Sequence, residues 1–140
     1  MEIITENAKE TQKVGEILAQ EIAKSKTANR KALVIGLEGE LGSGKTTFIQ
    51  GLAKGLKIKE RITSPTFVII RKIGWFYHID CYRVKPRDLL DLGFKEIISR
   101  PNLVVIEWAE RARKILPKNS LWIKFKHLGQ GKRKISLWQN

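Results

Sequence analysis

The sequence predicts an α/β fold in which a mixed, largely parallel sheet is flanked by helices and carries antiparallel hairpins at an edge. Continuous apolar runs at 31–38 and 103–106 have the composition of buried strands, and each is followed by a stretch with helical spacing. Later β-rich runs meet at glycines, as the strands of hairpins do. Strands that alternate with helices and end in hairpins build a mixed sheet. At 140 residues, we expect one domain spanning 1–140.

The N-terminal half is expected to begin with a helix. Asn7 is a good N-cap for a helix over Ala8–Lys24. Its expected apolar stripe consists of Val14, Ile17, Leu18 and Ile22. The run Lys31–Glu38 then predicts a strand, and apolar residues at helical intervals predict a helix over Thr46–Leu56.

The middle of the chain predicts a hairpin followed by a short helix. Thr66–Ile73 and Trp75–Ile79 are β-rich runs joined near Gly74, so that the second strand carries Asp80 at its end. Pro86 suits the first turn of a short helix through Leu92, and Gly93 breaks this helix before Phe94–Ser99.

The C-terminal part predicts one more buried strand and a terminal hairpin. The strand Leu103–Ile106 closes on Glu107, and a helix over Glu110–Leu116 ends at Pro117. Leu121–Lys126 and Lys134–Trp138 alternate around the glycines of 129–131, which is typical of an antiparallel hairpin.

The segment between the first predicted strand and its helix reads GELGSGKTT and completes the G-x-x-x-x-G-K-[ST] pattern of a phosphate-binding loop. Its glycines let successive N–H groups curl around an anion, and the following helix presents its positive end. We expect Lys45 to reach the β and γ phosphates and Thr46 to bind Mg²⁺. The expected nucleotide contacts in the loop are Gly39, Glu40, Leu41, Gly42, Ser43, Gly44, Lys45, Thr46 and Thr47.

Such a loop needs acidic partners to hold Mg²⁺ and orient water. Glu107 is the first candidate, although the Asp usual at this place is absent. Asp80, after the second hairpin strand, is the other; alternatively it pairs with Arg83 or caps the next turn. We therefore predict Lys45, Asp80 and Glu107 as catalytic residues, with Thr46, Asp80 and Glu107 on the metal. His78 is expected to be structural.

Ser64, Pro65 and Thr66 stand where many enzymes with such a loop carry a switch that senses the γ-phosphate. Pro65 restricts the backbone, and the hydroxyls can bond phosphate or Mg²⁺. An ordinary turn is the alternative reading.

The chain is strongly basic: 27 Lys and Arg face 14 Asp and Glu, a net charge of +13. Such a net charge attracts polyanions. The basic residues are densest in Lys124–Lys134, and the alternative interpretation of this segment is a solvated hairpin with basic side chains. Cys81 is the single cysteine, so no intramolecular disulfide forms. No run approaches the roughly 18 apolar residues of a membrane span. We expect a cytoplasmic protein.

Together, GELGSGKTT at 39–47, SPTF at 64–67, HIDCYR at 78–83, DLLDLGFKEII at 88–98 and VVIEWAER at 104–111 resemble the bacterial TsaE family, the ATPases of tRNA threonylcarbamoyladenosine biosynthesis. The resemblance covers nearly the whole chain in the family's order. It implies a small P-loop ATPase domain that binds ATP, ADP and Mg²⁺. It also implies hydrolysis in complex with TsaD-type and TsaB-type subunits, in support of modification of adenosine 37 in tRNAs that read ANN codons.

The resemblance also implies individual roles. Thr11 matches a family threonine close to the adenine, and Arg133 matches a basic residue after a glycine that contacts nucleotide. Thr46 and Glu107 would hold Mg²⁺, and Asp80 would be essential for hydrolysis. Ala109 departs from the proline of many members, and the region after Leu116 is short and unusually basic.

Other classes of function remain open from the residues. A small-molecule kinase would use HIDCYR for its acceptor and the ERARK segment at 110–114 as a lid, but no lid insert is visible between Glu107 and Pro117. A non-catalytic RNA-binding module would explain the charge, although no RNA-recognition signature is present. Direct contact with tRNA inside a complex is a further expectation.

Overall fold

The computed structural model describes residues 1–25, 30–62 and 69–139. The described chain forms two compact units. The first unit holds residues 1–25, 39–62 and 124–137, and the second holds 30–38, 69–123 and 138–139. The single domain expected from the length therefore stays an expectation. Within the described ranges, no helix has the length and apolar character that crossing a bilayer requires.

The strands form a seven-stranded sheet in the order β1-β7-β6-β2-β5-β4-β3. Their bounds in chain order are β1 Glu2–Thr5, β2 Leu33–Glu38, β3 Ile70–Ile73, β4 Phe76–Asp80, β5 Leu103–Glu107, β6 Leu121–Gly129 and β7 Lys132–Gln139. β2 and β4 run parallel to β5, whereas β1 pairs antiparallel with β7 and β3 antiparallel with β4. The predicted mixed α/β sheet is confirmed.

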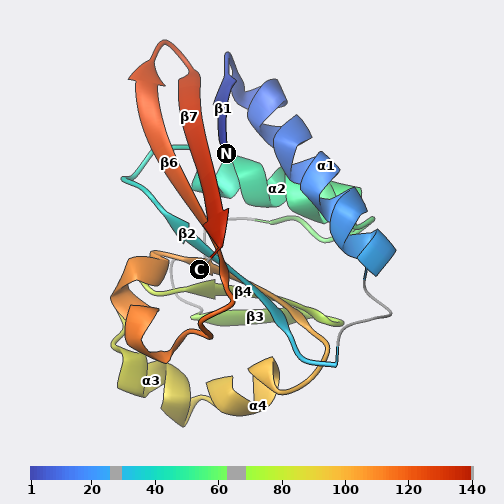
Figure 1. Ribbon diagram of the computed structural model, residues 1–140, viewed down its shortest axis with the longest axis vertical. Coiled ribbons are helices and arrows are strands. Elements are labelled where there is room, and N and C mark those ends of the chain that lie inside the picture. The colour runs from blue at the N-terminus through green and yellow to red at the C-terminus, as the bar shows by residue number, and fades with distance from the viewer. Residues whose placement is uncertain (26–29, 63–68, 140) are drawn as a thin grey trace. The chain divides into compact units, whose positions relative to one another are not determined.

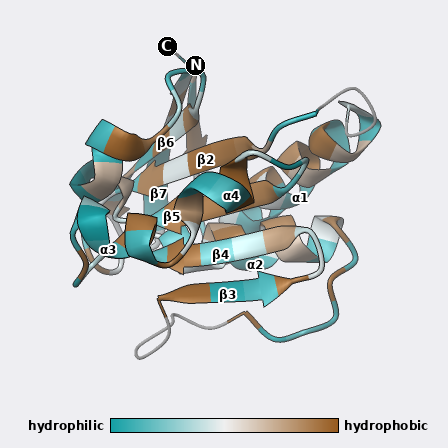
Figure 2. Ribbon diagram, turned by 90° about the horizontal axis from the view of Figure 1, so that it is seen from below, coloured by the Kyte–Doolittle hydropathy of each residue, from teal (hydrophilic) through white to brown (hydrophobic). Residues whose placement is uncertain are grey.

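The second unit has β5 at its centre. All of β5 is buried, and its neighbours are in register, with Val104 beside Val34 and Tyr77. Figure 2 shows β2 and β5 as largely hydrophobic ribbons. Such runs are typical of parallel strands that are covered on both faces.

Short helices follow the strands of the second unit, as the sequence predicts. They are α3 Pro86–Asp91, α4 Phe94–Ile98 and η2 Ala109–Ile115. Gly93 separates α3 from α4 with a φ of 91°, a left-handed conformation that suits glycine. The helix predicted over 110–116 forms as the 3₁₀ helix η2 rather than as an α-helix.

The first unit packs α1 (Ala8–Ser25) against α2 (Lys45–Gly55), which lie side by side in Figure 1. The two backbones approach closely at glycines. A Cβ on Gly15 would lie 2.4 Å from the carbonyl oxygen of Phe48, and one on Gly51 would lie 2.0 Å from that of Gln12. Only glycine fits at either position.

This close packing corrects the stripe predicted for α1. Ile17 is 51% exposed. The buried residues are Thr11, Gly15, Ala19 and Ile22, so Ile22 is the one member of the predicted stripe that is confirmed as buried. Small side chains let α2 come near, so the buried face is shifted away from the one that hydrophobicity alone favours. The N-cap prediction is confirmed, because the Glu10 N–H donates to Asn7 Oδ1 at 2.9 Å.

The edge strand β1 was not predicted. It pairs with β7, with Ile3 opposite Ile135. EIIT is too short to show an alternating pattern, and its partner lies at the other end of the chain. The predicted terminal hairpin is confirmed and is longer than expected, with its turn at Gln130 and Gly131, both with positive φ.

Candidate functional site: a phosphate loop and two acidic strand ends

The loop that precedes α2 belongs to the first unit, and its backbone depends on glycine. Gly39, Gly42 and Gly44 have φ values of 147°, 76° and 104°. A Cβ on Gly39 would lie 2.7 Å from both the Phe125 carbonyl oxygen and Ser43 Oγ. The chain therefore has room for this curled loop only without a side chain at that position.

The loop closes on the start of α2. Gly44 is the N-cap, and its carbonyl accepts the Phe48 N–H at 2.9 Å. Lys45 is 5% exposed. Its ammonium donates to the Gly39 carbonyl, so the side chain lies across the loop. Leu41, by contrast, is 77% exposed. N–H groups at the start of a helix favour anions, which the buried ammonium reinforces.

Arg133 of β7 lies against this loop. A Cβ on Gly44 would be 3.3 Å from Arg133 Nε. That Nε and Ser43 Oγ are buried and have no hydrogen-bond partner among the described residues. A buried donor without an acceptor costs roughly 1–3 kcal/mol. An oxyanion in the loop would supply the missing acceptor, so these atoms fit a phosphate group.

Thr11 is 1% exposed at the corner between β1 and α1. Its hydroxyl lies 2.7 Å from that of Thr5 and bonds the Asn7 carbonyl at 3.3 Å. Thr5 is a partner that sequence reasoning missed, because β1 itself was missed. The two hydroxyls brace this corner. The hairpin turn lies close to it, because a Cβ built on Gly131 would be 3.6 Å from the Glu6 carbonyl oxygen.

The predicted acids lie together in the second unit. Asp80 ends β4 and Glu107 ends β5, and the two are register partners on neighbouring parallel strands. The Cys81 N–H donates to the Glu107 carbonyl at 2.9 Å, which continues the pairing past the strand ends. Asp80 Oδ1 accepts the Tyr82 N–H at 2.9 Å, so Asp80 caps the next turn as the alternative reading expected.

Glu107 is held by the histidine of the same motif. His78 Nε2 lies 2.7 Å from Glu107 Oε2, and the two residues are 0% and 3% exposed. His78 Nδ1 has no partner among the described residues. Nε2 and the carboxylate oxygen share one buried hydrogen bond, which orients both side chains. Sequence reasoning gave His78 a structural role and missed this contact.

The segments that leave the acids carry aromatic rings and arginine. Trp108 follows Glu107 with a φ of 57°, unusual for a bulky residue. Its ring centroid is 5.0 Å from that of Tyr82, and Arg111 covers both rings and donates to the Tyr82 carbonyl. The acids therefore stand between a buried strand and a packed aromatic cluster.

Cys81, which separates Asp80 from Tyr82, is buried and unreactive. Burial, and secondarily the neighbouring charges of Asp80 and Glu110, raise the pKa of its thiol to about 12. No group of three or more metal-binding His, Cys, Asp or Glu side chains occurs in the part of the chain that the structure describes.

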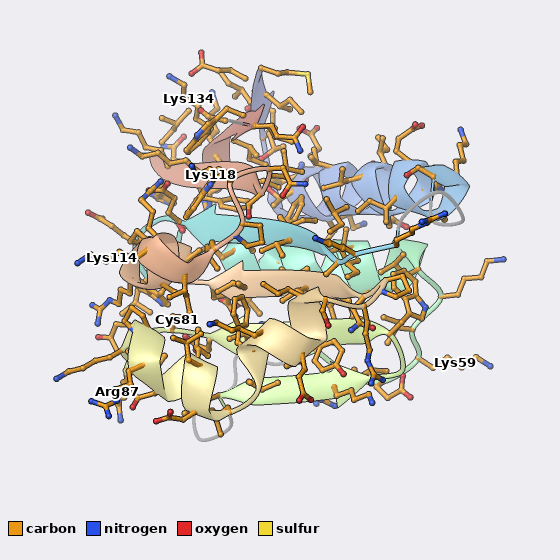
Figure 3. All side chains as sticks on the ribbon, turned by 60° about the horizontal axis from the view of Figure 1, so that its bottom comes forward. Lys59, Cys81, Arg87, Lys114, Lys118 and Lys134 are labelled. Carbon is orange, nitrogen blue, oxygen red and sulfur yellow. The ribbon has the colours of Figure 1, made fainter. Side chains whose placement is uncertain are left out.

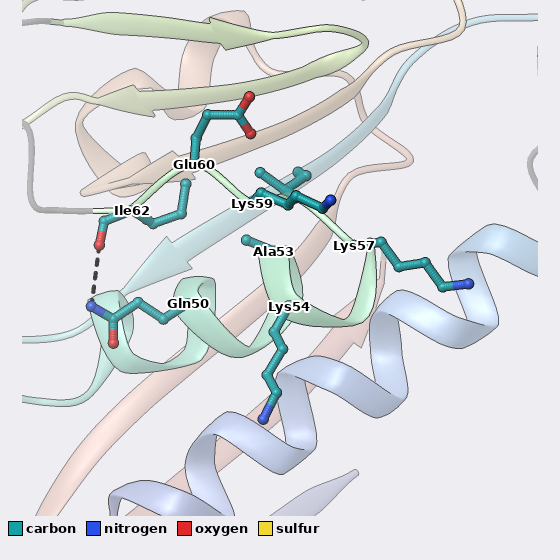
Figure 4. Close-up of a pocket in the computed structure, with 8 residues that line it drawn as sticks. Gln50, Ala53, Lys54, Lys57, Lys59, Glu60 and Ile62 are labelled. Atoms are coloured by element: carbon teal, nitrogen blue, oxygen red, sulfur yellow. Dashed lines mark hydrogen bonds between the residues drawn. The ribbon is translucent and has the colours of Figure 1, made fainter.

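The predicted switch of Ser64, Pro65 and Thr66 lies outside the described residues. The chain just before it is anchored, because Gln50 Nε2 of α2 donates to the Ile62 carbonyl at 3.2 Å. Figure 4 shows this bond at the edge of an open pocket of about 390 Å³. The pocket is lined by Gln50, Ala53, Lys54, Lys57, Ile58, Lys59, Glu60 and Ile62.

Known proteins are similar to this chain in sequence. The family model of the threonylcarbamoyl adenosine biosynthesis protein TsaE matches residues 5–135. A protein of Treponema pallidum named tRNA threonylcarbamoyladenosine biosynthesis protein TsaE is 33% identical over 98% of this chain and 99% of its own length. The Aquifex aeolicus protein of that name is 33% identical over 99% and 96%.

A solved structure is also similar to this chain in fold. The crystal structure of Bacillus subtilis YdiB superposes with a TM-score of 0.79 at 30% identity, covering 98% of this chain and 83% of that one. The family match spans the phosphate loop, both acidic strand ends and Arg133. The chain belongs to the TsaE family.

Proposed function

We propose that this chain is an Mg²⁺-dependent ATPase that serves the threonylcarbamoylation of adenosine 37 in tRNAs reading ANN codons. It hydrolyses ATP to ADP and phosphate, slowly alone and faster in complex with TsaD-type and TsaB-type subunits. The observation that carries the proposal is the glycine loop at the start of α2, with buried donors of Ser43 and Arg133 that have no acceptor among the described residues.

The phosphates are the part of the nucleotide that these residues fit. Backbone N–H groups of 39–47 surround them, and Lys45 exchanges the Gly39 carbonyl for the β and γ phosphates. Arg133 supplies a second cation through the guanidinium beside Gly44. We assign Thr11 to the part of the site that holds the adenine base. It acts there by bracing the β1–α1 corner together with Thr5.

Glu107 and Asp80 are the acids of the proposed reaction. With Thr46 they would hold Mg²⁺, which neutralises charge on the phosphates when bound. His78 bonds Glu107 Oε2 and so holds this carboxylate in place at the end of β5. Asp80 is already fixed by its backbone bond to Tyr82, so it needs little reordering to take part.

Two features support the proposed partner dependence. Ser64, Pro65 and Thr66 are proposed to respond to the γ-phosphate, as switch segments of nucleotide-binding loops do. The chain also has no visible segment for a second substrate between Glu107 and Pro117, so ATP hydrolysis is proposed to change the conformation of the complex rather than to phosphorylate an acceptor.

The test is phosphate release from ATP, measured with Mg²⁺ for the chain alone, with each partner subunit, and with both. We expect at least about ten-fold acceleration with both partners and no transfer to a small-molecule acceptor. The Lys45→Ala variant serves as the control for contaminating ATPases. Turnover that stays the same when both partners are added contradicts the proposal.

A further inference from the structure

The solvent side of β6 carries lysines that the site above does not use. Lys124 and Lys126 are exposed, whereas Ile123 and Phe125 between and beside them are buried. Because side chains alternate along a strand, both lysines lie on one face. Leu128, 43% exposed, continues that row. We call Lys124, Lys126 and Leu128 the β6 lysine row.

The neighbouring strands extend the basic surface but neutralise part of it. On β7, Lys134 pairs with Glu2 at 2.9 Å, and this hydrogen bond lowers the pKa of the Glu2 carboxyl. Lys132 pairs with Glu6 at 3.4 Å. Figure 3 labels Lys134 on this hairpin. Among the described residues, neither Lys124 nor Lys126 forms an ion pair, so the charge of both lysines is uncompensated.

The β6 lysine row also borders a pocket of about 350 Å³. Its wall is formed by the phosphate loop at Gly39, Glu40, Leu41 and Ser43 and by β6 at Lys124, Phe125, Lys126 and His127. Glu40 is the one acid in this lining, and it belongs to the loop side. An anionic ligand on the β6 side would therefore touch the lysines without facing a carboxylate on the same strand.

We propose that the β6 lysine row binds the phosphodiester backbone of RNA, and specifically of the tRNA substrate. Residues two apart on a strand are roughly 6.8 Å apart, a separation that lets successive lysines meet successive phosphates. Lysine acts as a point charge toward phosphate and reads no sequence. The net charge of +13 adds long-range attraction for the same polyanion.

The residue composition of the β6 lysine row favours RNA over an acidic protein as its ligand. Protein interfaces are centred on aromatic side chains and arginine, with lysine depleted. The β6 lysine row consists of two lysines and one leucine and contains no aromatic side chain or arginine. The inference rests on the proposed function, since a role in tRNA modification supplies the RNA.

The experiment measures fluorescence anisotropy of a labelled tRNA transcript that reads an ANN codon, titrated with the full chain at two salt concentrations and without ATP. The test variant is Lys124→Glu with Lys126→Glu. The matched control is Lys9→Glu with Lys13→Glu on the exposed side of α1, which changes the net charge equally. Circular dichroism and thermal melting check that both variants fold.

We expect the β6 variant to weaken tRNA binding at least about ten-fold and to lower the slope of log Kd against log salt by about two, while the control changes binding less than about three-fold. Equal weakening by both variants, unchanged binding by the β6 variant, or a wild-type Kd weaker than about 100 µM at low salt overturns the proposal. Displacement of the tRNA by poly-glutamate at equal charge concentration overturns it in favour of an acidic protein.

This result is independent of partner-activated hydrolysis, because the assay contains neither ATP nor partner subunits. A chain that binds tRNA through the β6 lysine row but is not accelerated by its partners contradicts only the proposed ATPase function. A chain that is accelerated but binds tRNA equally well with both lysines reversed contradicts only the inference.

Discussion

The phosphate loop and the acidic strand ends differ in how their geometry is determined. The loop is local: three glycines with positive φ bring Gly39 to Gly44 around to the start of α2, and Lys45 returns to Gly39. The acidic ends are non-local: Glu107 takes its orientation from His78, 29 positions away, across neighbouring parallel strands. A loop can be recognised from its residues alone, whereas a carboxylate's second partner depends on strand register.

This difference separates two jobs that the proposed reaction needs. The loop offers donors and positive charge, which grip phosphate in any state of the reaction. The acids offer a fixed carboxylate, which matters most when water attacks. Substitutions in the two regions are therefore expected to affect different measured quantities.

Glu107→Gln tests the acidic side most strongly. Loss of the charge is expected to lower ATP hydrolysis about 100-fold or more, because metal binding and water orientation are transition-state functions. ATP affinity should change less than about five-fold. Single-turnover phosphate release and equilibrium titration with a fluorescent ATP analogue measure the two. If ATP affinity falls as much as the rate of hydrolysis, Glu107 contributes to nucleotide binding rather than specifically to the hydrolysis step.

Lys45→Ala tests the loop. Removal of the ammonium is expected to weaken ATP binding about 50-fold, as loss of a charge-assisted bond to phosphate does. Lys54→Ala, at the exposed end of the same helix where Lys54 pairs with Glu16 at 3.7 Å, is the matched control. Calorimetric titration measures both variants. Equal affinities for the two would show that the loop is not the phosphate site.

His78→Leu removes the hydrogen bond to Glu107 and leaves that carboxylate buried. We expect about ten-fold slower hydrolysis and a higher Mg²⁺ concentration for half-maximal rate, since partners of metal-binding groups tune affinity. His78→Gln keeps a donor and should restore part of both. If Leu and Gln variants are equally slow with unchanged Mg²⁺ dependence, His78 is structural only.

The glycine loop allows a matched pair of stability measurements. Gly39→Ala brings Cβ to 2.7 Å from a backbone oxygen, whereas a Cβ on Gly42 meets nothing within 4 Å. Both substitutions strain a positive φ, at about 1 kcal/mol. Gly39→Ala should lower the free energy of unfolding by about 2 kcal/mol more than Gly42→Ala. Urea denaturation at constant pH compares them, and equal losses would mean that the loop relaxes freely.

The smallest effect concerns pH and Cys81. The thiol ionises in the unfolded chain near 9.0, but its pKa in the folded chain is about 12. Above pH 9 the unfolded state therefore loses a proton that the folded state keeps, and stability falls with rising pH. Cys81→Ala should lose less stability than the wild type between pH 8 and 10.5 in parallel thermal melts. Identical slopes would show that the thiol is solvated.

The sequence anticipates the elements whose signals are local. The buried runs of β2 and β5, the cap at Asn7, the break at Gly93 and the terminal hairpin all form where predicted. What it does not show depends on partners distant in the chain. EIIT becomes β1 only beside β7, and the buried face of α1 is determined by its close contact with the glycines of α2, which leaves Ile17 exposed although Ile22 is buried.

The same rule applies within the candidate site. The loop and the ends of β4 and β5 are visible as motifs, and both acids do end neighbouring strands. The hydrogen bond between His78 and Glu107 depends on the register of β4 and β5. The place of the unpartnered Arg133 Nε beside Gly44 depends on the position of β7. Side-chain pairing across strands is a tertiary property, so no spacing in the sequence predicts it.

In the proposed reaction, the loop and the acids act on one nucleotide. A crystal structure with Mg²⁺ and a non-hydrolysable ATP analogue tests this arrangement. We expect phosphates enclosed by residues 39–47, the Thr46 hydroxyl and the Glu107 carboxylate on or one water from the Mg²⁺, and His78 still bonded to Glu107. A nucleotide bound in the loop with Glu107 and Asp80 both outside the first two coordination shells of the metal would contradict it.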